Sequence, residues 1–189
     1  MDSLGLQVLS VLLQKKVLRI KQKLSKTLGK IRRYNMTFLM AVGISVGILA
    51  GLWTAASVSF GLVTFAGFLS WASFYAAGGK LNGLKTSLIL NFSGVIWGYL
   101  IVLAAGLLGP IIGATVGLGL AVALGAAGMC WQAKISWLGF IPGAFIGCSA
   151  FFATNFDFAG AVVGLICGAV LGYISEAMAL AMQKKEIAK

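Results

Sequence analysis

Side chains able to carry acid–base or metal chemistry are scarce in this chain of 189 residues. Histidine, the commonest general base and metal ligand, is absent. The only acids are Asp2, Asp157, Glu176 and Glu186. The cysteines lie in apolar runs without metal-ligand spacing, which favours a packing role: Cys130, Cys148 and Cys167. With no phosphate loop, dinucleotide fingerprint or Ser-His-Asp set either, the sequence predicts no enzyme, no metal and no cofactor.

Two polar residues inside apolar stretches remain as candidates for function. Asn91 carries an amide that is expensive to bury in lipid without partners, so it should hydrogen-bond to another helix or to a solute. Glu176 lies near the end of the last apolar stretch. It is either an interfacial charge or a gate or proton site.

An aromatic segment occurs twice, as FLSWASFYAAGG from Phe68 and as FIGCSAFFATN from Phe145. We expect the two segments to line a path for a solute near the middle of the membrane, although each aromatic could instead face the core or lipid. The pore-lining candidates are Ser70, Trp71, Phe74, Asn91, Trp97, Phe145, Cys148 and Phe151. Pro142 and Gly143, just before the second copy, could break its helix locally.

The composition shows which elements must position these residues. The chain is 60% hydrophobic, with a mean hydropathy of +0.99, which is typical of an integral membrane protein. A bilayer core about 30 Å thick needs roughly 20 apolar residues per helix. Six segments qualify: Met36–Ala56, Phe60–Ala77, Leu84–Leu108, Ile111–Trp131, Ile135–Thr154 and Phe158–Met182.

The basic residues predict the orientation of these segments. Nine Lys and Arg residues precede position 34, Lys80 and Lys85 flank the second joint, Lys134 lies in the fourth, and the rest lie in the tail. With six crossings all of them fall on one side, which the positive-inside rule makes cytoplasmic, together with both termini. We therefore expect a leader at 1–34, a six-helix transmembrane domain at 35–183 and a short basic tail at 184–189.

The two halves of the domain resemble each other. Phe68, Phe74 and Ala76 recur 77 positions later, and Gly94, Gly98 and Tyr99 recur 74 positions later. Three helices per half is an odd number, so a true repeat must be inverted in the membrane. Chance similarity between Gly-rich helices is the alternative. The predicted fold is all-α, with six transmembrane helices in a 3+3 inverted repeat after a basic amphipathic helix.

Glycines spaced by four residues follow one face of several predicted helices. In lipid, such small-xxx-small faces allow helices to pack closely, although some could line a narrow passage. The predicted helix-packing residues are Gly43, Gly47, Gly51, Gly94, Gly98, Gly143, Gly147, Gly164, Gly168 and Gly172. Through such faces we also expect a homo-oligomer.

The leader at 2–34 carries apolar residues at a spacing of three to four, with lysines and arginines between them. A basic amphipathic helix of this kind is expected to lie on an anionic cytoplasmic lipid surface. Docking of a partner protein or a neighbouring subunit, or cleavage as a targeting presequence, are the alternatives. The net charge of +11 does not indicate a nucleic-acid partner, because no aromatic residues are interleaved with the basic ones.

Several stretches together suggest a family: GILAGLW, FAGFLSWASFYAAGG, SGVIWG, QAK and FIPGAFIG. In order and spacing, the region from Gly43 to Tyr173 resembles the YcdZ-like bacterial inner-membrane proteins, the family of domain of unknown function 1097. The resemblance implies a compact multi-helix inner-membrane protein. It implies no substrate and no functional residues, and the basic leader lies outside it.

These features favour a passive channel or facilitator for a small neutral or weakly ionised solute, because buried ionisable groups for coupling are lacking. Two alternatives remain open. One is a membrane anchor whose leader recruits a cytoplasmic partner. The other is a coupled secondary transporter that depends on Glu176.

Overall fold

The computed structural model describes residues 14–22 and 37–187, with side chains described up to residue 183, and all regular structure in these ranges is helical. Most of the predicted leader, and the end of the tail, lie outside the described residues. Residues 14–22 form an exposed helix. The remaining helices are α2 (Phe38–Ser59), α3 (Thr64–Ala76), α4 (Lys80–Ile112), α5 (Ala114–Trp131), α6 (Ile141–Ala153) and α7 (Phe158–Ile187), with 3-10 turns at Gln132–Lys134 and Ser136–Leu138.

A helix matches each of the six predicted segments, but their lengths differ. Four stretches are long and apolar enough to cross a membrane: Phe38–Ser59, Lys80–Ile112, Ala114–Lys134 and Phe158–Gln183. The other two helices, α3 and α6, have 13 residues each. They are about 20 Å long, which is shorter than a bilayer core.

Local chemistry explains the short helices. After α3 the chain turns through Gly78 and Gly79, both at positive φ, where glycine has no steric penalty. Before α6, the 3-10 turn at Ser136–Leu138 takes up residues expected to belong to the helix. Pro142 does not break α6, contrary to the prediction. It lies in the first turn of the helix, where no backbone N–H is needed.

Side chains cap two of the long helices. Thr37 Oγ1 accepts a hydrogen bond from the Met40 backbone N–H (3.3 Å) at the start of α2. Asp157 Oδ1 accepts from the Gly160 N–H (3.0 Å) in the first turn of α7. Both satisfy donors that a helix start leaves free, so Asp157 caps α7.

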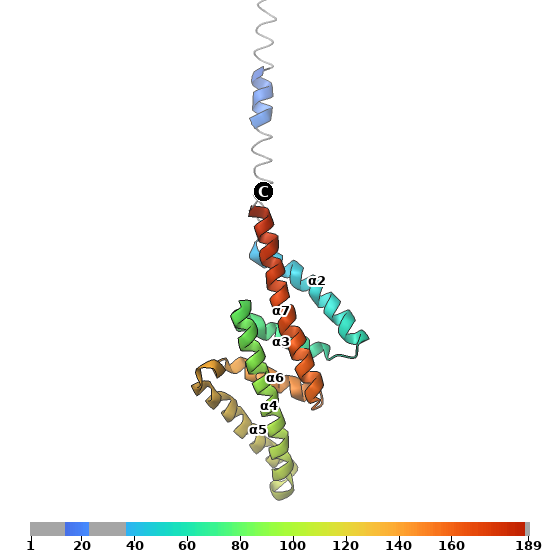
Figure 1. The fold of residues 1–189 in the computed structure, drawn as a ribbon, viewed down its shortest axis with the longest axis vertical. Helices are drawn as coiled ribbons and strands as arrows, with labels where there is room; N and C mark the ends of the chain where they lie inside the picture. Colours follow the sequence, from blue (N-terminus) through green and yellow to red (C-terminus); the bar gives the residue numbers. More distant parts are fainter. Residues whose placement is uncertain (1–13, 23–36, 188–189) are drawn as a thin grey trace, which may run out of the picture.

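The helices form two packing groups that meet where α4 lies against α7. Helix α7 packs against α3 and α2, whereas α4 packs against α6 and α5. Helices α4 and α7 lie side by side near the middle of the molecule, and the short α3 and α6 lie across them (Figure 1). Each group therefore contains the last helix of one half of the chain and the first two helices of the other half.

Glycines set the closest helix contacts. Gly94 of α4 lies against the backbone of Ala144 in α6, and Gly168 of α7 lies against the backbone of Gly67 in α3. Next along the same helices, Gly98 faces the ring of Phe151 and Gly172 faces the ring of Phe74. A side chain in place of these glycines would force the helices apart.

The two turns that lead out of α3 and α6 are also alike. The Gly79 N–H donates to the Phe74 carbonyl and the Phe156 N–H donates to the Phe151 carbonyl, both at 3.1 Å. Gly79 and Phe156 have the same φ of 67°. These residues stand 77 positions apart, which is the offset of the repeated aromatic segment.

The outer surface of the bundle is apolar. Large side chains such as Leu39 (80% exposed), Leu107 (74%) and Ile111 (77%) point outward from α2 and α4. Water would not tolerate so much exposed hydrocarbon, whereas lipid does. The surface is that of an integral membrane protein, as its composition predicts.

Candidate functional site

The first part of the candidate site is a fully buried cluster of Ser70, Ser73 and Asn91, named here the Asn91 cluster. Asn91 Nδ2 donates to Ser70 Oγ (2.9 Å), and Ser73 Oγ donates to Asn91 Oδ1 (2.8 Å). All three residues are at most 1% exposed. The hydroxyls come from α3 and the amide from α4, so the cluster joins the two packing groups.

A second group of polar side chains meets around Ser175 and is named here the Ser175 network. Trp71 Nε1 donates to Ser175 Oγ (3.1 Å), and Ser175 Oγ itself donates to the Gly172 carbonyl (2.7 Å). Because that bond takes the one hydroxyl hydrogen of Ser175, Tyr75 must be the donor in its 2.7 Å contact with Ser175 Oγ. Ser45 of α2 donates to the Ser175 carbonyl (2.8 Å).

Glu176 follows Ser175 in α7, and its side chain reaches the start of α4. Its Oε2 accepts a hydrogen bond from the Lys80 backbone N–H (2.5 Å), and the side chain is only 9% exposed. The positive end of a helix suits a carboxylate, particularly away from water. Glu176 therefore connects α7 to α4. These two helices belong to the two packing groups that the Asn91 cluster also joins.

The other predicted pore-lining residues have varied environments. Phe74, Phe151 and Cys148 are buried in helix contacts. Trp97 is half-buried, and its Nε1 donates to Gln132 Oε1 (2.9 Å). Phe145 is 40% exposed, on the outer surface. The structure thus joins Ser70 to Asn91 and bonds Trp71 to Ser175, the neighbour of Glu176 in the chain, but it does not bring all eight candidates together.

The predicted packing glycines also divide into two sets. Seven of them have neighbours that a side chain would strike: Gly94, Gly98, Gly143, Gly147, Gly164, Gly168 and Gly172. The three on α2 have no atom within 4 Å of where a Cβ would lie: Gly43, Gly47 and Gly51. Among the residues that the structure describes, nothing therefore covers the α2 glycine face.

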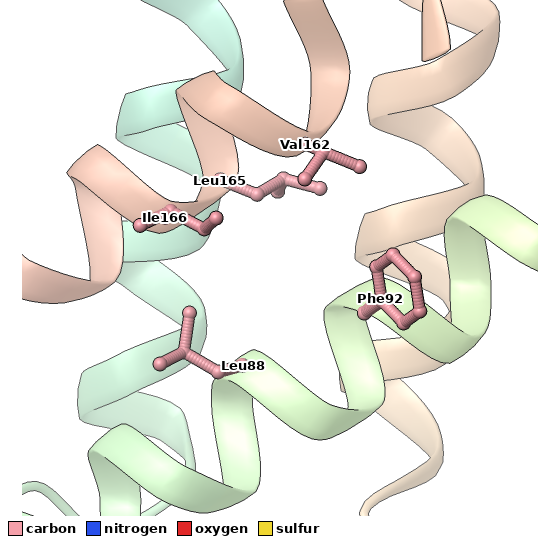
Figure 2. Close-up of a pocket in the computed structure, with 5 residues that line it drawn as sticks. All are labelled: Leu88, Phe92, Val162, Leu165 and Ile166. Atoms are coloured by element: carbon pink, nitrogen blue, oxygen red, sulfur yellow. The ribbon is translucent and has the colours of Figure 1, made fainter. Parts of the chain in front are cut away.

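A cavity of about 280 Å³ lies between α4 and α7 (Figure 2). Its lining is entirely hydrocarbon: Leu88, Phe92, Val162, Leu165 and Ile166. Such a lining suits an acyl chain and offers nothing to a polar solute. The cavity borders the core through Leu165, which is only 3% exposed.

Sequence reasoning missed Ser45, Tyr75 and Ser175. A serine in a membrane helix commonly bonds to its own backbone, so its type and position alone do not mark a site. Ser175 does this too, but it also collects two further side chains from α3. The repeat offered one signal. Ser175 corresponds to Ile101, 74 positions earlier, so a polar residue stands where the other copy of the repeat has an apolar one.

The geometry and the long apolar helices define a multi-helix membrane protein. Residues 43–180 match the family model described as "Protein of unknown function (DUF1097)", and the chain belongs to this family. It is 36% identical over 149 residues to the Escherichia coli protein described as "Uncharacterized protein YahC", covering 75% of this chain and 90% of the relative.

Two further relatives are each described as "Inner membrane protein YcdZ". The Escherichia coli protein is 37% identical over 145 residues, which cover 73% of this chain and 83% of the relative. The Salmonella typhimurium protein is 36% identical over 140 residues, which cover 73% of this chain and 85% of the relative. No solved structure matches the chain.

Proposed function

We propose that the six apolar helices cross the membrane as two inverted triplets, α2–α3–α4 and α5–α6–α7. Contacts that map onto each other support this arrangement. Gly94 contacts Ala144, and Gly168 contacts Gly67. Gly168 lies 74 positions after Gly94, and Gly67 lies 77 positions before Ala144, so the repeat offsets convert one contact into the other. The pairs Gly98–Phe151 and Gly172–Phe74 are related in the same way. Offsets of opposite sign within one contact are expected for two halves related by a two-fold axis.

The short helices are compatible with six crossings if the bilayer is locally thinned around them. In Figure 1 they lie across α4 and α7, so in this proposal both the short and the long helices are tilted from the membrane normal. The turns that flank α3 and α6 then cover the remaining thickness. Both chain ends lie in the cytoplasm in this arrangement, with the basic joints on the same side.

The two halves differ in chemistry at corresponding positions, and this difference carries the functional proposal. The counterparts of Ser70, Ser73 and Asn91 are Gly147, Ala150 and Leu165. Helix packing therefore does not require the Asn91 cluster, because the second half builds the same crossing from apolar residues. A buried polar group that packing does not need is a candidate for function.

The Ser175 network follows the same rule. The counterparts of Trp71, Tyr75 and Ser175 are Cys148, Phe152 and Ile101. These three pack together within one apolar cluster to which α4, α5 and α6 contribute. The surroundings of α3 thus form a polar region, with members from Glu176, at the predicted cytoplasmic end, to Asn91. The surroundings of α6 are apolar at the corresponding positions.

We infer from this polar region that the protein is a non-enzymatic facilitator of a small neutral or weakly ionised solute in the bacterial inner membrane. The Asn91 cluster would bind the solute, and the cytoplasmic polar region would lead to it. Burial of the cluster favours a state closed on both sides, which must open for passage, over a permanently open pore.

Two associations complete the proposal. The open glycine face of α2 is the surface through which we expect a homo-oligomer to form. The basic leader would lie on the anionic lipid of the cytoplasmic leaflet.

Solute flux into proteoliposomes tests the function. We expect the wild-type protein to pass at least one of urea, short amides, aldehydes, ammonia and short acids faster than empty liposomes do. Asn91→Leu should reduce this flux to the level of empty liposomes, since leucine occupies the corresponding position in the second half and should pack there.

Ser57→Ala is the matched control for Asn91→Leu. Ser57 is fully buried and bonds to Thr64 Oγ1 (2.6 Å), but it belongs to neither polar group. This variant should keep wild-type flux. Wild-type protein that passes none of these solutes would contradict the proposal.

A membrane anchor is the second candidate, favoured by the backbone contacts of Gly94, Gly147 and Gly168, which leave no gap at those points. This function predicts a cytoplasmic partner that co-purifies in fixed stoichiometry. The partner should be lost when residues 2–33 are deleted, and the flux should stay at background.

A further inference from the structure

The Asn91 cluster has more hydrogens to donate than it can use internally. The two hydroxyls and the amide carry four donor hydrogens in total. Only two bonds connect them, Asn91 to Ser70 and Ser73 to Asn91. Among the described residues, no acceptor is found for the hydroxyl hydrogen of Ser70 or for the second amide hydrogen of Asn91.

This surplus does not depend on how the amide is oriented. If the Asn91 oxygen and nitrogen exchange places, Ser70 becomes a donor and Ser73 an acceptor. Two bonds are still formed, and two hydrogens are still left over. One of them always belongs to the amide and the other to a serine.

Unused donors in this position are unusual. The three residues are at most 1% exposed, so water at the surface cannot reach them. An unpaired donor without water destabilises the protein unless an acceptor arrives. The corresponding Gly147, Ala150 and Leu165 avoid the problem completely, which shows that the fold has an alternative.

We propose that the Asn91 cluster binds an uncharged solute through a carbonyl oxygen, which accepts the two surplus hydrogens. This inference rests on the proposed facilitator function and names its substrate class: ureas, short amides and aldehydes. A carbonyl oxygen accepts two hydrogen bonds and brings no hydrogen of its own. A hydroxyl oxygen carries a hydrogen on the accepting atom itself and presents it to a site that already has too many donors. The N–H groups of ureas and amides lie on nitrogen instead, and they can point away from the cluster.

A charged solute is disfavoured at the Asn91 cluster. The cluster itself contains no ionised group, and a carboxylate or ammonium would have to shed its water there without a counter-charge. The carboxylate of Glu176 is engaged with the Lys80 backbone N–H at the start of α4, about three helical turns before Asn91. The solute is therefore expected to pass in its neutral form.

Flux of size-matched solutes through the full-length protein in liposomes tests the substrate class. Urea and acetamide are compared with ethylene glycol and glycerol, each corrected for empty liposomes. We expect the carbonyl solutes to pass at least about tenfold faster than the glycols. Asn91→Leu should abolish this preference, and Ser57→Ala should keep it, with all variants monodisperse in detergent.

The outcomes separate the two proposals. If the glycols pass as fast as the carbonyl solutes and Asn91→Leu stops both, the carbonyl class is wrong and the facilitator function stands. If Asn91→Leu keeps the carbonyl preference, the cluster is not the binding site. If wild-type protein passes none of the solutes, both proposals fail.

Ser70→Ala provides a second measure should Asn91→Leu fold poorly. It removes the surplus hydroxyl hydrogen and frees a second amide hydrogen, so both remaining surplus hydrogens lie on the Asn91 nitrogen. Two hydrogens on one amide nitrogen point apart and cannot both reach one carbonyl oxygen. Alanine is small enough to fit against α4. We expect a lower flux of urea and acetamide and little change for glycerol. Equal loss for all solutes would overturn the carbonyl class.

Discussion

At the scale of single residues, Gly168 marks the closest approach of α7 to α3. A Cβ at this position would run into the backbone carbonyl of Gly67, which cannot move aside as a side chain could. We predict that Gly168→Ala destabilises the protein by about 1–3 kcal/mol, the usual range for overpacking. The unfolding temperature in detergent, followed by tryptophan fluorescence, measures this effect.

Gly106→Ala is the control for that substitution. Gly106 lies in α4 and has no atom within 4 Å of the place that a Cβ would take, so alanine should fit and slightly favour the helix. Equal unfolding temperatures for the two variants would show that the contact between Gly168 and Gly67 does not limit packing.

Residue types alone indicate part of the candidate site. Asn91 and Ser70 are conspicuous because polar groups at membrane depth need partners. Their pairing, and the meeting of Ser45 with Ser175, could not be predicted. Such partners lie up to 130 positions apart, and only the helix crossings determine which of them meet.

At the scale of elements, the turn between α3 and α4 holds three successive residues at positive φ: Gly78, Gly79 and Lys80. Lysine in this region is strained by its Cβ. The carboxylate of Glu176 offsets the strain by accepting the Lys80 N–H. We predict that Glu176→Ala costs about 1–2 kcal/mol and accelerates hydrogen exchange at this turn roughly tenfold.

Two comparisons make this test specific. Glu176→Gln keeps an oxygen acceptor and loses the charge, so its effect should be smaller. The turn at Asn155 and Phe156 has the same backbone hydrogen bonds and lies far along the chain from Glu176, so its exchange should not change. Equal acceleration at both turns would indicate global loosening rather than loss of this contact.

The positions of the elements were largely predictable, but the lengths of two were not. Hydropathy identified each apolar stretch, because lipid-facing helices must be apolar. It could not show that α3 and α6 end after 13 residues. Their ends depend on backbone geometry at Gly78, at Asn155 and in the 3-10 turns around Lys134, which an average over apolar residues does not register.

At the scale of the whole molecule, the two packing groups give the proposed function a mechanical basis. The groups α2–α3–α7 and α4–α5–α6 are each held by close glycine contacts. Between them lie the Asn91 cluster, the Glu176 contact with Lys80 and the apolar cavity of Figure 2. A relative movement of the groups would open this seam without breaking the tight contacts.

The number of crossings decides whether this scheme is correct, and labelling of single cysteines can measure it. If α3 crosses the membrane, Phe60 before it and Leu81 after it lie on opposite sides. If only the four long helices cross, both lie on the same side. Both side chains are well exposed, at 79% and 55%, so Phe60→Cys and Leu81→Cys should react readily.

We predict that an impermeant maleimide added to intact cells labels Phe60→Cys and that Leu81→Cys reacts only after the membrane is opened. Both substitutions are made in a chain whose cysteines are replaced by alanine, because Cys130 is exposed and would react as well. Ser136→Cys, in a cytoplasmic joint, should behave like Leu81→Cys. Labelling of Phe60→Cys and Leu81→Cys from the same side would contradict the inverted triplets. It would also remove the correspondence between Asn91 and Leu165 on which the solute site depends.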